Sequence, residues 1–184
     1  MVISRGKANM NEFMKQTFNY CRELNGELEE VMQTFGDGCA FCKVSVRDGG
    51  YDFLINIELN EFDKHQYKAN DQIKFKLALM HTWYGELYKD ENEFFKCTNG
   101  KAAPESFVPH MYYDDNGAHE DSSAFVCGKV ISVENIEIDN VQCSHVTIRC
   151  LGCALDLFYT TAGLPEIRQG NIIGGRYDVI GWAT

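Results

Sequence analysis

The chain lacks any apolar run long enough to cross a bilayer. Its longest runs, such as Leu77–Met80, contain only a few residues, whereas a membrane helix needs about 20. An export signal is also missing, because polar residues follow Arg5 and Lys7 where a signal peptide would carry its apolar core. We therefore expect a cytoplasmic protein with no membrane partner.

Clusters of positive charge are missing as well. The net charge is −10, and residues 91–121 alone carry seven acidic and two basic side chains. Binding to a phosphate backbone requires clustered Lys and Arg, so nucleic acid is excluded as an expected partner. A basic protein partner suits this charge distribution better.

The familiar catalytic signatures are absent too. The sequence contains no GxSxG motif, phosphate-binding glycine loop, dinucleotide fingerprint or HExxH group. Of the five histidines, His110 and His119 lie near acidic residues, which admits a weak metal site, but a solvated loop is the favoured interpretation. We therefore predict no catalytic residue, no cofactor and no metal ligand.

Eight cysteines include two CxxC pairs, Cys39/Cys42 and Cys150/Cys153. Four thiolates at such spacing can bind zinc, but 107 residues separate the pairs and the residues inside each pair are mostly apolar. In a chain without an export signal, reduced and buried thiols are the expected state. The sequence therefore predicts no stoichiometric metal.

Residues 10–35 have the periodicity of an amphipathic helix. Apolar side chains recur there at intervals of three and four, and Gly36-Asp37-Gly38 provides a stop. We expect the apolar stripe to pack on the protein's own sheet, with docking of a partner helix as the alternative.

Beyond this segment the period changes to two, which is typical of strands. Residues 73–79 alternate most regularly, and the chain from 122 to the end contains four stretches rich in Val, Ile, Thr, Tyr and Phe. We predict a β-rich α+β fold in three regions: residues 1–90, an N-terminal helix plus an antiparallel sheet; 91–121, an acidic turn-rich connection; and 122–184, an antiparallel barrel. The two β regions are expected to pack together as small antiparallel sheets or barrels.

The two β regions share a plan. In each, a hairpin precedes a connector, a tight turn (Ala69-Asn70-Asp71 or Gln169-Gly170-Asn171) and a long strand. This order fits a duplication, and it also fits any antiparallel meander.

Residues 122–184 resemble an OB-fold or a related small barrel. The resemblance rests on Gly128–Val133 in the first strand, the following hairpin, and Gly170–Gly175 before the last strand. OB-folds often bind single-stranded nucleic acid or oligosaccharide. Nucleic-acid binders combine stacking aromatics with basic grooves, and this segment has a net charge of −2, so that function is not transferred.

Two functional classes follow from these observations. The favoured one is a non-enzymatic binding or adaptor protein that recognises a basic protein partner through an acidic, tyrosine-containing surface, as immunity proteins do. The alternative is a barrel that binds a small molecule or oligosaccharide, or an enzyme whose site is assembled from distant residues. The sequence does not decide whether the protein forms a homo-oligomer. The residues predicted to contact the partner are Tyr112, Tyr113, Asp114, Asp115, Glu120, Asp121, Tyr177 and Trp182.

Overall fold

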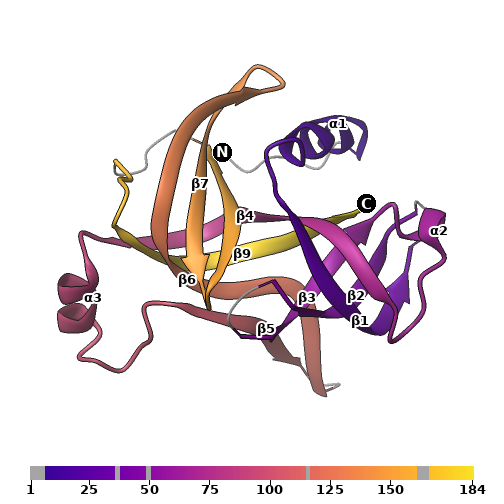
Figure 1. The fold of residues 1–184 in the computed structure, drawn as a ribbon, viewed down its shortest axis with the longest axis horizontal. Helices are drawn as coiled ribbons and strands as arrows, with labels where there is room; N and C mark the ends of the chain where they lie inside the picture. The colour runs from indigo at the N-terminus through magenta and orange to yellow at the C-terminus, as the bar shows by residue number, and fades with distance from the viewer. Residues whose placement is uncertain (1–6, 36–37, 49–50, 115–116, 161–165) are drawn as a thin grey trace.

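The computed structural model describes residues 7–35, 38–48, 51–114, 117–160 and 166–184 (Figure 1). Of these, the side chains of residues 7–11, 82–84, 112–114, 118 and 160 lie outside the description. The elements in chain order are α1 (Lys7–Thr17), β1 (Glu23–Thr34), β2 (Ala40–Val46), β3 (Phe53–Asn60), α2 (Phe62–His65), β4 (Gln72–Tyr88), α3 (Glu91–Cys97), β5 (Ser106–Asp114), β6 (Gly117–Ile138), β7 (Val141–Cys150), β8 (Cys153–Thr160) and β9 (Ile172–Ala183).

The nine strands form one mixed sheet in the order β1-β2-β3-β9-β4-β8-β7-β6-β5. Two further pairings, β1 with β4 and β6 with β9, close this sheet on itself. The result is two rings of five strands, β1-β2-β3-β9-β4 and β6-β7-β8-β4-β9, which share β4 and β9. The prediction of a β-rich fold is therefore confirmed, but the strands form one shared sheet instead of two separate antiparallel ones.

Two short parallel pairings make the sheet mixed. Residues 58–60 of β3 run parallel to 180–182 of β9, and residues 78–80 of β4 run parallel to 156–158 of β8. These contacts join segments more than 75 residues apart in sequence, so the local periodicity of the sequence cannot predict these two parallel pairings.

The predicted N-terminal helix is wrong beyond Thr17, where α1 ends. Residues 23–34 form β1, which pairs with both β2 and β4. Irregularities in the β1–β2 register after Leu28 and after Val31 shift the alternation. Because Leu24, Leu28 and Val31 point to the core on either side of such a shift, their spacing imitates a helical stripe.

The acidic connection is also more ordered than predicted. It contains α3, whose start is capped by the Asp90 carboxylate accepting from the Glu93 amide, followed by β5 and the beginning of β6. Asp90 is a residue type that commonly caps helices. The division of the chain into three regions stays a prediction. The two strands that both rings share, β4 and β9, come from different regions of that division.

The core runs through both rings. Its main cluster extends from Leu24 to Ala183 and includes the inward residues of β4, namely Ile73, Phe75, Leu77 and Leu79. A second cluster lies on the opposite face of β4 and β9, where Met14 and Phe18 pack against Ala78 and Phe158. Figure 1 shows α1 on this side, next to the projecting β6–β7 hairpin. In the described residues, no helix is long and apolar enough to span a bilayer.

Candidate functional site

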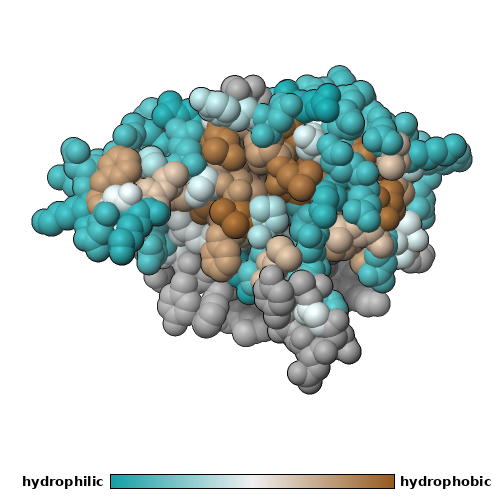
Figure 2. Space-filling model, turned by 90° about the horizontal axis from the view of Figure 1, so that it is seen from below, coloured by the Kyte–Doolittle hydropathy of each residue, from teal (hydrophilic) through white to brown (hydrophobic). Residues whose placement is uncertain are grey.

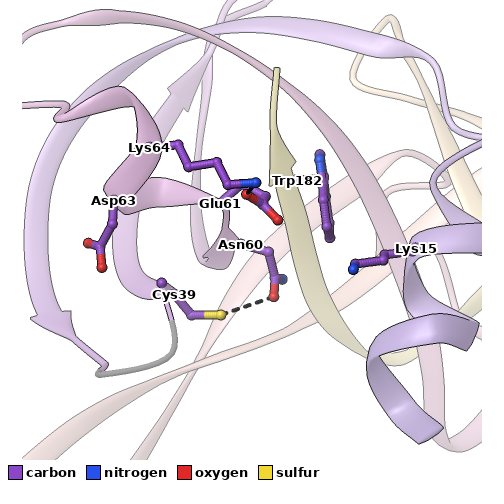
Figure 3. A pocket seen from close by; sticks show the side chains of 8 residues that line it. Lys15, Cys39, Asn60, Glu61, Asp63, Lys64 and Trp182 are labelled. Carbon is purple, nitrogen blue, oxygen red and sulfur yellow. Dashed lines mark hydrogen bonds and ion pairs between the residues drawn. The ribbon is translucent and has the colours of Figure 1, made fainter. Parts of the chain in front are cut away.

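A cavity of about 220 Å³ lies between the end of α1, the start of β2, α2 and the end of β9 (Figure 3). At its floor, the Cys39 thiol donates to Asn60 Oδ1 at 3.0 Å, and Asn60 Nδ2 donates to the Gly181 carbonyl at 3.0 Å. Lys64 forms an ion pair with Glu61 at the rim. The polar groups at the floor thus serve to join β2, β3 and β9.

The size and chemistry of this cavity do not indicate a ligand. Its walls mix Lys15, Lys64, Glu61, Asp63 and Trp182, so neither sign of charge dominates. Its volume is below the roughly 300–1,000 Å³ typical of small-molecule sites. A second cavity, of about 180 Å³, is smaller still and is lined by Phe35, Phe41, Glu58, Glu120, Asp121 and Ser122.

Two of the predicted contact residues lie at this second cavity, and the structure engages both in the fold. The Glu120 carboxylate accepts from Asn56 Nδ2 at 3.1 Å and lies 3.0 Å from Lys43 Nζ. Asn56 is buried on the outer side of β3. Glu120 therefore fastens the start of β6 to the first ring, a role that spacing in the sequence could not reveal.

Asp121 is the centre of a second polar network. It accepts from the Ser123 hydroxyl at 2.6 Å and the Ser123 amide at 2.9 Å. His110 Nδ1 and Arg176 Nη2 lie 3.1 and 3.2 Å from its other oxygen. Partial burial raises the pKa of Asp121, but hydrogen bonds from Ser123 and His110 outweigh it, so the pKa lies below its ordinary value. This network fastens β5 and β6 to β9.

Next to this network, β5 and β6 expose an apolar pair. Val108 and Phe125 are directly opposite each other in the β5–β6 register and are 54% and 51% exposed. The His110 ring meets the Phe125 ring edge-on, with centroids 5.8 Å apart. We call Val108, His110 and Phe125 the hairpin face. Figure 2, which views the side of the molecule on which β5 lies, shows apolar side chains gathered amid hydrophilic ones.

The hairpin face also lies at the open edge of the sheet. Among the strands of the described residues, β5 alone pairs with a single neighbour, because ring closure gives each other strand two or more. Pro109 lies in the middle of β5 and removes one backbone donor. Proline on an edge strand discourages uncontrolled strand addition.

The remaining predicted contact residues have different outcomes. Asp115 and the side chains of Tyr112, Tyr113 and Asp114 lie outside the described residues. Tyr177 is fully buried, and its hydroxyl shares a hydrogen bond with that of Tyr159 inside the second ring, so it presents no surface to a partner. Trp182 is partly buried, with its ring 5.6 Å from that of Phe18.

Sequence reasoning missed a buried acid on the outer side of the second ring. Asp156 is 2% exposed and accepts from His145 Nε2 at 2.9 Å, Thr147 Oγ1 at 3.2 Å and the Arg22 amide at 3.0 Å. The His145 ring stacks on Phe158 at 5.0 Å. The polar residue Asp156 between Leu155 and Leu157 was the available signal. This network fastens the α1–β1 connection to β8 through the bond from the Arg22 amide.

Six of the eight cysteines are buried, Cys127 is partly buried and Cys97 is exposed. Burial raises the pKa of Cys42 to about 12 and that of Cys153 to about 11, and it also raises the pKa of Cys150. Within the described part of the chain, no group of three or more His, Cys, Asp or Glu side chains could hold a metal ion. The absence of bound metal stays a prediction for elemental analysis.

No protein-family model matches the chain, and no curated protein matches it either.

Proposed function

We propose that this chain is a non-enzymatic protein-binding protein that contacts its partner through the hairpin face. The observation that carries the proposal is the exposed Val108–Phe125 pair on the β5–β6 hairpin, in which β5 pairs, among the described strands, with β6 alone. Exposed apolar and aromatic side chains that gather on one surface mark interaction sites, and aromatic residues are enriched among interface hot spots.

Charge supports the choice of partner. The net charge of −10 favours a partner with basic residues around an apolar centre, because complementary charge accelerates encounter. Glu120 and Asp121 are tied to Lys43 and Arg176, so we assign them the task of holding the hairpin in place. A cytoplasmic location is part of the same proposal.

The ring topology supports an OB-like interpretation of both halves. Each ring consists of three antiparallel strands, a parallel contact and an antiparallel return to the first strand, as in a five-stranded OB barrel. In the first ring, however, the β2–β3 face that OB-folds use for oligonucleotides is covered near Asn56 by Glu120. The cavities likewise give no specific support to a small-molecule function.

Capture from the source cells tests the proposal. The tagged chain, a Val108→Ser/Phe125→Ser variant and a Phe95→Ser variant would be used as parallel baits. Phe95, which is 42% exposed on α3, provides a matched control because it is an exposed phenylalanine away from the hairpin face. We expect one enriched partner with the wild type and Phe95→Ser, and at least about tenfold less with the double variant, as expected when a hot-spot pair is lost.

Circular dichroism of all three proteins would verify that the fold is kept. A partner retained equally by the double variant would place the interface elsewhere and refute the proposal. A partner lost only with Phe95→Ser would move the interface to α3.

A further inference from the structure

We infer that residues 23–88 and 125–183 are two copies of one structural unit, and that the two copies bind each other by sharing their last strands. The interaction surface is that last strand, β4 in one copy and β9 in the other, and its partner is a second copy of the same unit within the chain. This inference is independent of the proposed function.

The order of pairings is the same in both rings. In the first, β1, β2 and β3 are antiparallel neighbours, β3 is parallel to β9, and β4 returns to β1. In the second, β6, β7 and β8 are antiparallel neighbours, β8 is parallel to β4, and β9 returns to β6. Each ring therefore consists of four strands from one copy and the last strand of the other.

The turns before the shared strands have matching hydrogen bonds. The Lys68 amide donates to the Asp71 carboxylate at 2.7 Å, and the Arg168 amide donates to Asn171 Oδ1 at 2.8 Å. Both turns have a left-handed residue, with φ of 71° at Asn70 and 90° at Gly170.

Each turn also binds the first strand of its copy through the same two backbone bonds. Asn70 N donates to Leu28 O and Leu28 N to Asp71 O, while Gly170 N donates to Val130 O and Val130 N to Asn171 O. The register then shifts directly after Leu28 in β1 and directly after Val130 in β6. A bulge at the same place in both copies marks a repeated feature of the unit.

A glycine lies two residues before Leu28 and another lies two residues before Val130, and close packing requires both. A Cβ at Gly26 would lie 2.8 Å from Val44 Cγ1 and 2.9 Å from the Ser45 carbonyl oxygen. At Gly128 it would lie 2.6 Å from Ile148 Cδ1 and 2.7 Å from the Arg149 carbonyl oxygen. The same local crowding thus occurs twice.

The register of the shared strands locates a two-fold axis. Leu79 pairs with Val179, Ala78 with Ile180 and Met80 with Asp178. If 100 is added to each residue number in β4 and subtracted from each residue number in β9, the Ala78–Ile180 pair becomes the Met80–Asp178 pair, and the Leu79–Val179 pair becomes itself. The axis passes through the Leu79–Val179 pair. A chain whose halves complete each other in this way should unfold as one unit, because neither ring is closed without the other copy.

Hydrogen exchange of the full-length chain tests the inference with a matched pair of variants, Gly26→Ala and Gly128→Ala. We expect each variant to lower the protection of the slowest amides in β2–β3 and in β7–β8 by the same factor, about tenfold or more, and we expect the two variants to act alike. Asp71→Ala and Asn171→Ala form a second, milder pair should an alanine at a crowded glycine prevent folding.

Loss of protection confined to the variant's own half would show that the halves open independently and would overturn the inference. Wild-type exchange in both glycine variants would also overturn it, because the repeated crowding would then be absent.

Discussion

Replacing Asp156 with alanine should be strongly destabilising. The change removes a carboxylate that is 2% exposed and leaves the His145 ring, the Thr147 hydroxyl and the Arg22 amide without their acceptor. His145 cannot compensate through its other ring nitrogen, because Nδ1 is buried and has no hydrogen-bond partner among the described residues. Each orphaned buried group costs about 1–3 kcal/mol, and removing one member of a buried charged network typically costs about 3–5 kcal/mol.

We therefore expect Asp156→Ala to lower the free energy of unfolding by about 3–5 kcal/mol. For a chain of this size, each kcal/mol shifts Tm by roughly 2–4 °C, so Tm should fall by about 6–20 °C. Urea denaturation followed by circular dichroism gives the free energy directly, provided that the slope with urea is unchanged.

Two controls separate the network from surface charge. Glu134→Ala removes an exposed acid on β6 and should change stability by less than about 0.5 kcal/mol. Arg22→Ala should also cost little, about 1 kcal/mol or less, because the ion pair of its 48% exposed side chain spans 3.7 Å while the backbone amide keeps its bond. An Asp156→Ala effect no larger than that of Glu134→Ala would refute the reasoning.

Three further predictions concern the core, the pH response and the hairpin. Gly181→Ala should lower the free energy of unfolding by about 1–3 kcal/mol through overpacking, because the new Cβ would lie 2.5 Å from Ile57 Cδ1. Gly174→Ala, whose new Cβ would have its nearest neighbour at 3.6 Å, should lower it by about 0.5 kcal/mol or less. Urea titration of both variants compares them. Burial lowers the pKa of His81 below its ordinary 6.5, so the unfolded chain takes up this proton first and His81 stabilises the fold less as pH falls below about 6.5. Midpoints measured between pH 7 and 5 should lose this acid dependence in His81→Phe and keep it in the exposed control His65→Phe. Glu120→Gln should speed hydrogen exchange in residues 117–122, because it weakens the bonds to Lys43 and Asn56. The free energy of global unfolding should change by about 1 kcal/mol or less. Unchanged exchange in residues 117–122 would mean that Glu120 does not hold the hairpin.

Regular alternation made part of the fold predictable. Ile73, Phe75, Leu77 and Leu79 all face the core, as their spacing predicts. The turns at Asp139-Asn140 and Leu151-Gly152 have positive φ at all four residues, a conformation that Asn and Gly adopt readily.

Bulges and long-range pairing limited the rest. Leu24 and Leu28 are two inward positions of a strand, and the bulge after Leu28 brings Val31 inward as well, which reproduces helical spacing without a helix. The closure of the rings depends on parallel contacts such as Leu59 with Gly181, and no local pattern encodes a contact at such separation.

The candidate site was only partly predictable for related reasons. The charge excess drew attention to the segment that contains Glu120 and Asp121, which both lie on β6. Their roles depend on Asn56 and Arg176, which come from distant strands. Tyr177 resembled an exposed aromatic because it lies between Arg176 and Asp178, yet alternation in β9 turns it into the core.

Site-specific cross-linking at position 125 tests the proposed function most directly. Phe125 would be replaced by a photoreactive phenylalanine analogue in the full-length chain, with Phe95 replaced likewise in a control, and both proteins irradiated in the source cells. We predict one defined protein adduct from position 125 and none from position 95, because the two sites are similarly exposed and only the first lies in the proposed interface. An adduct of the same protein from position 95 but not from position 125 would contradict the proposal.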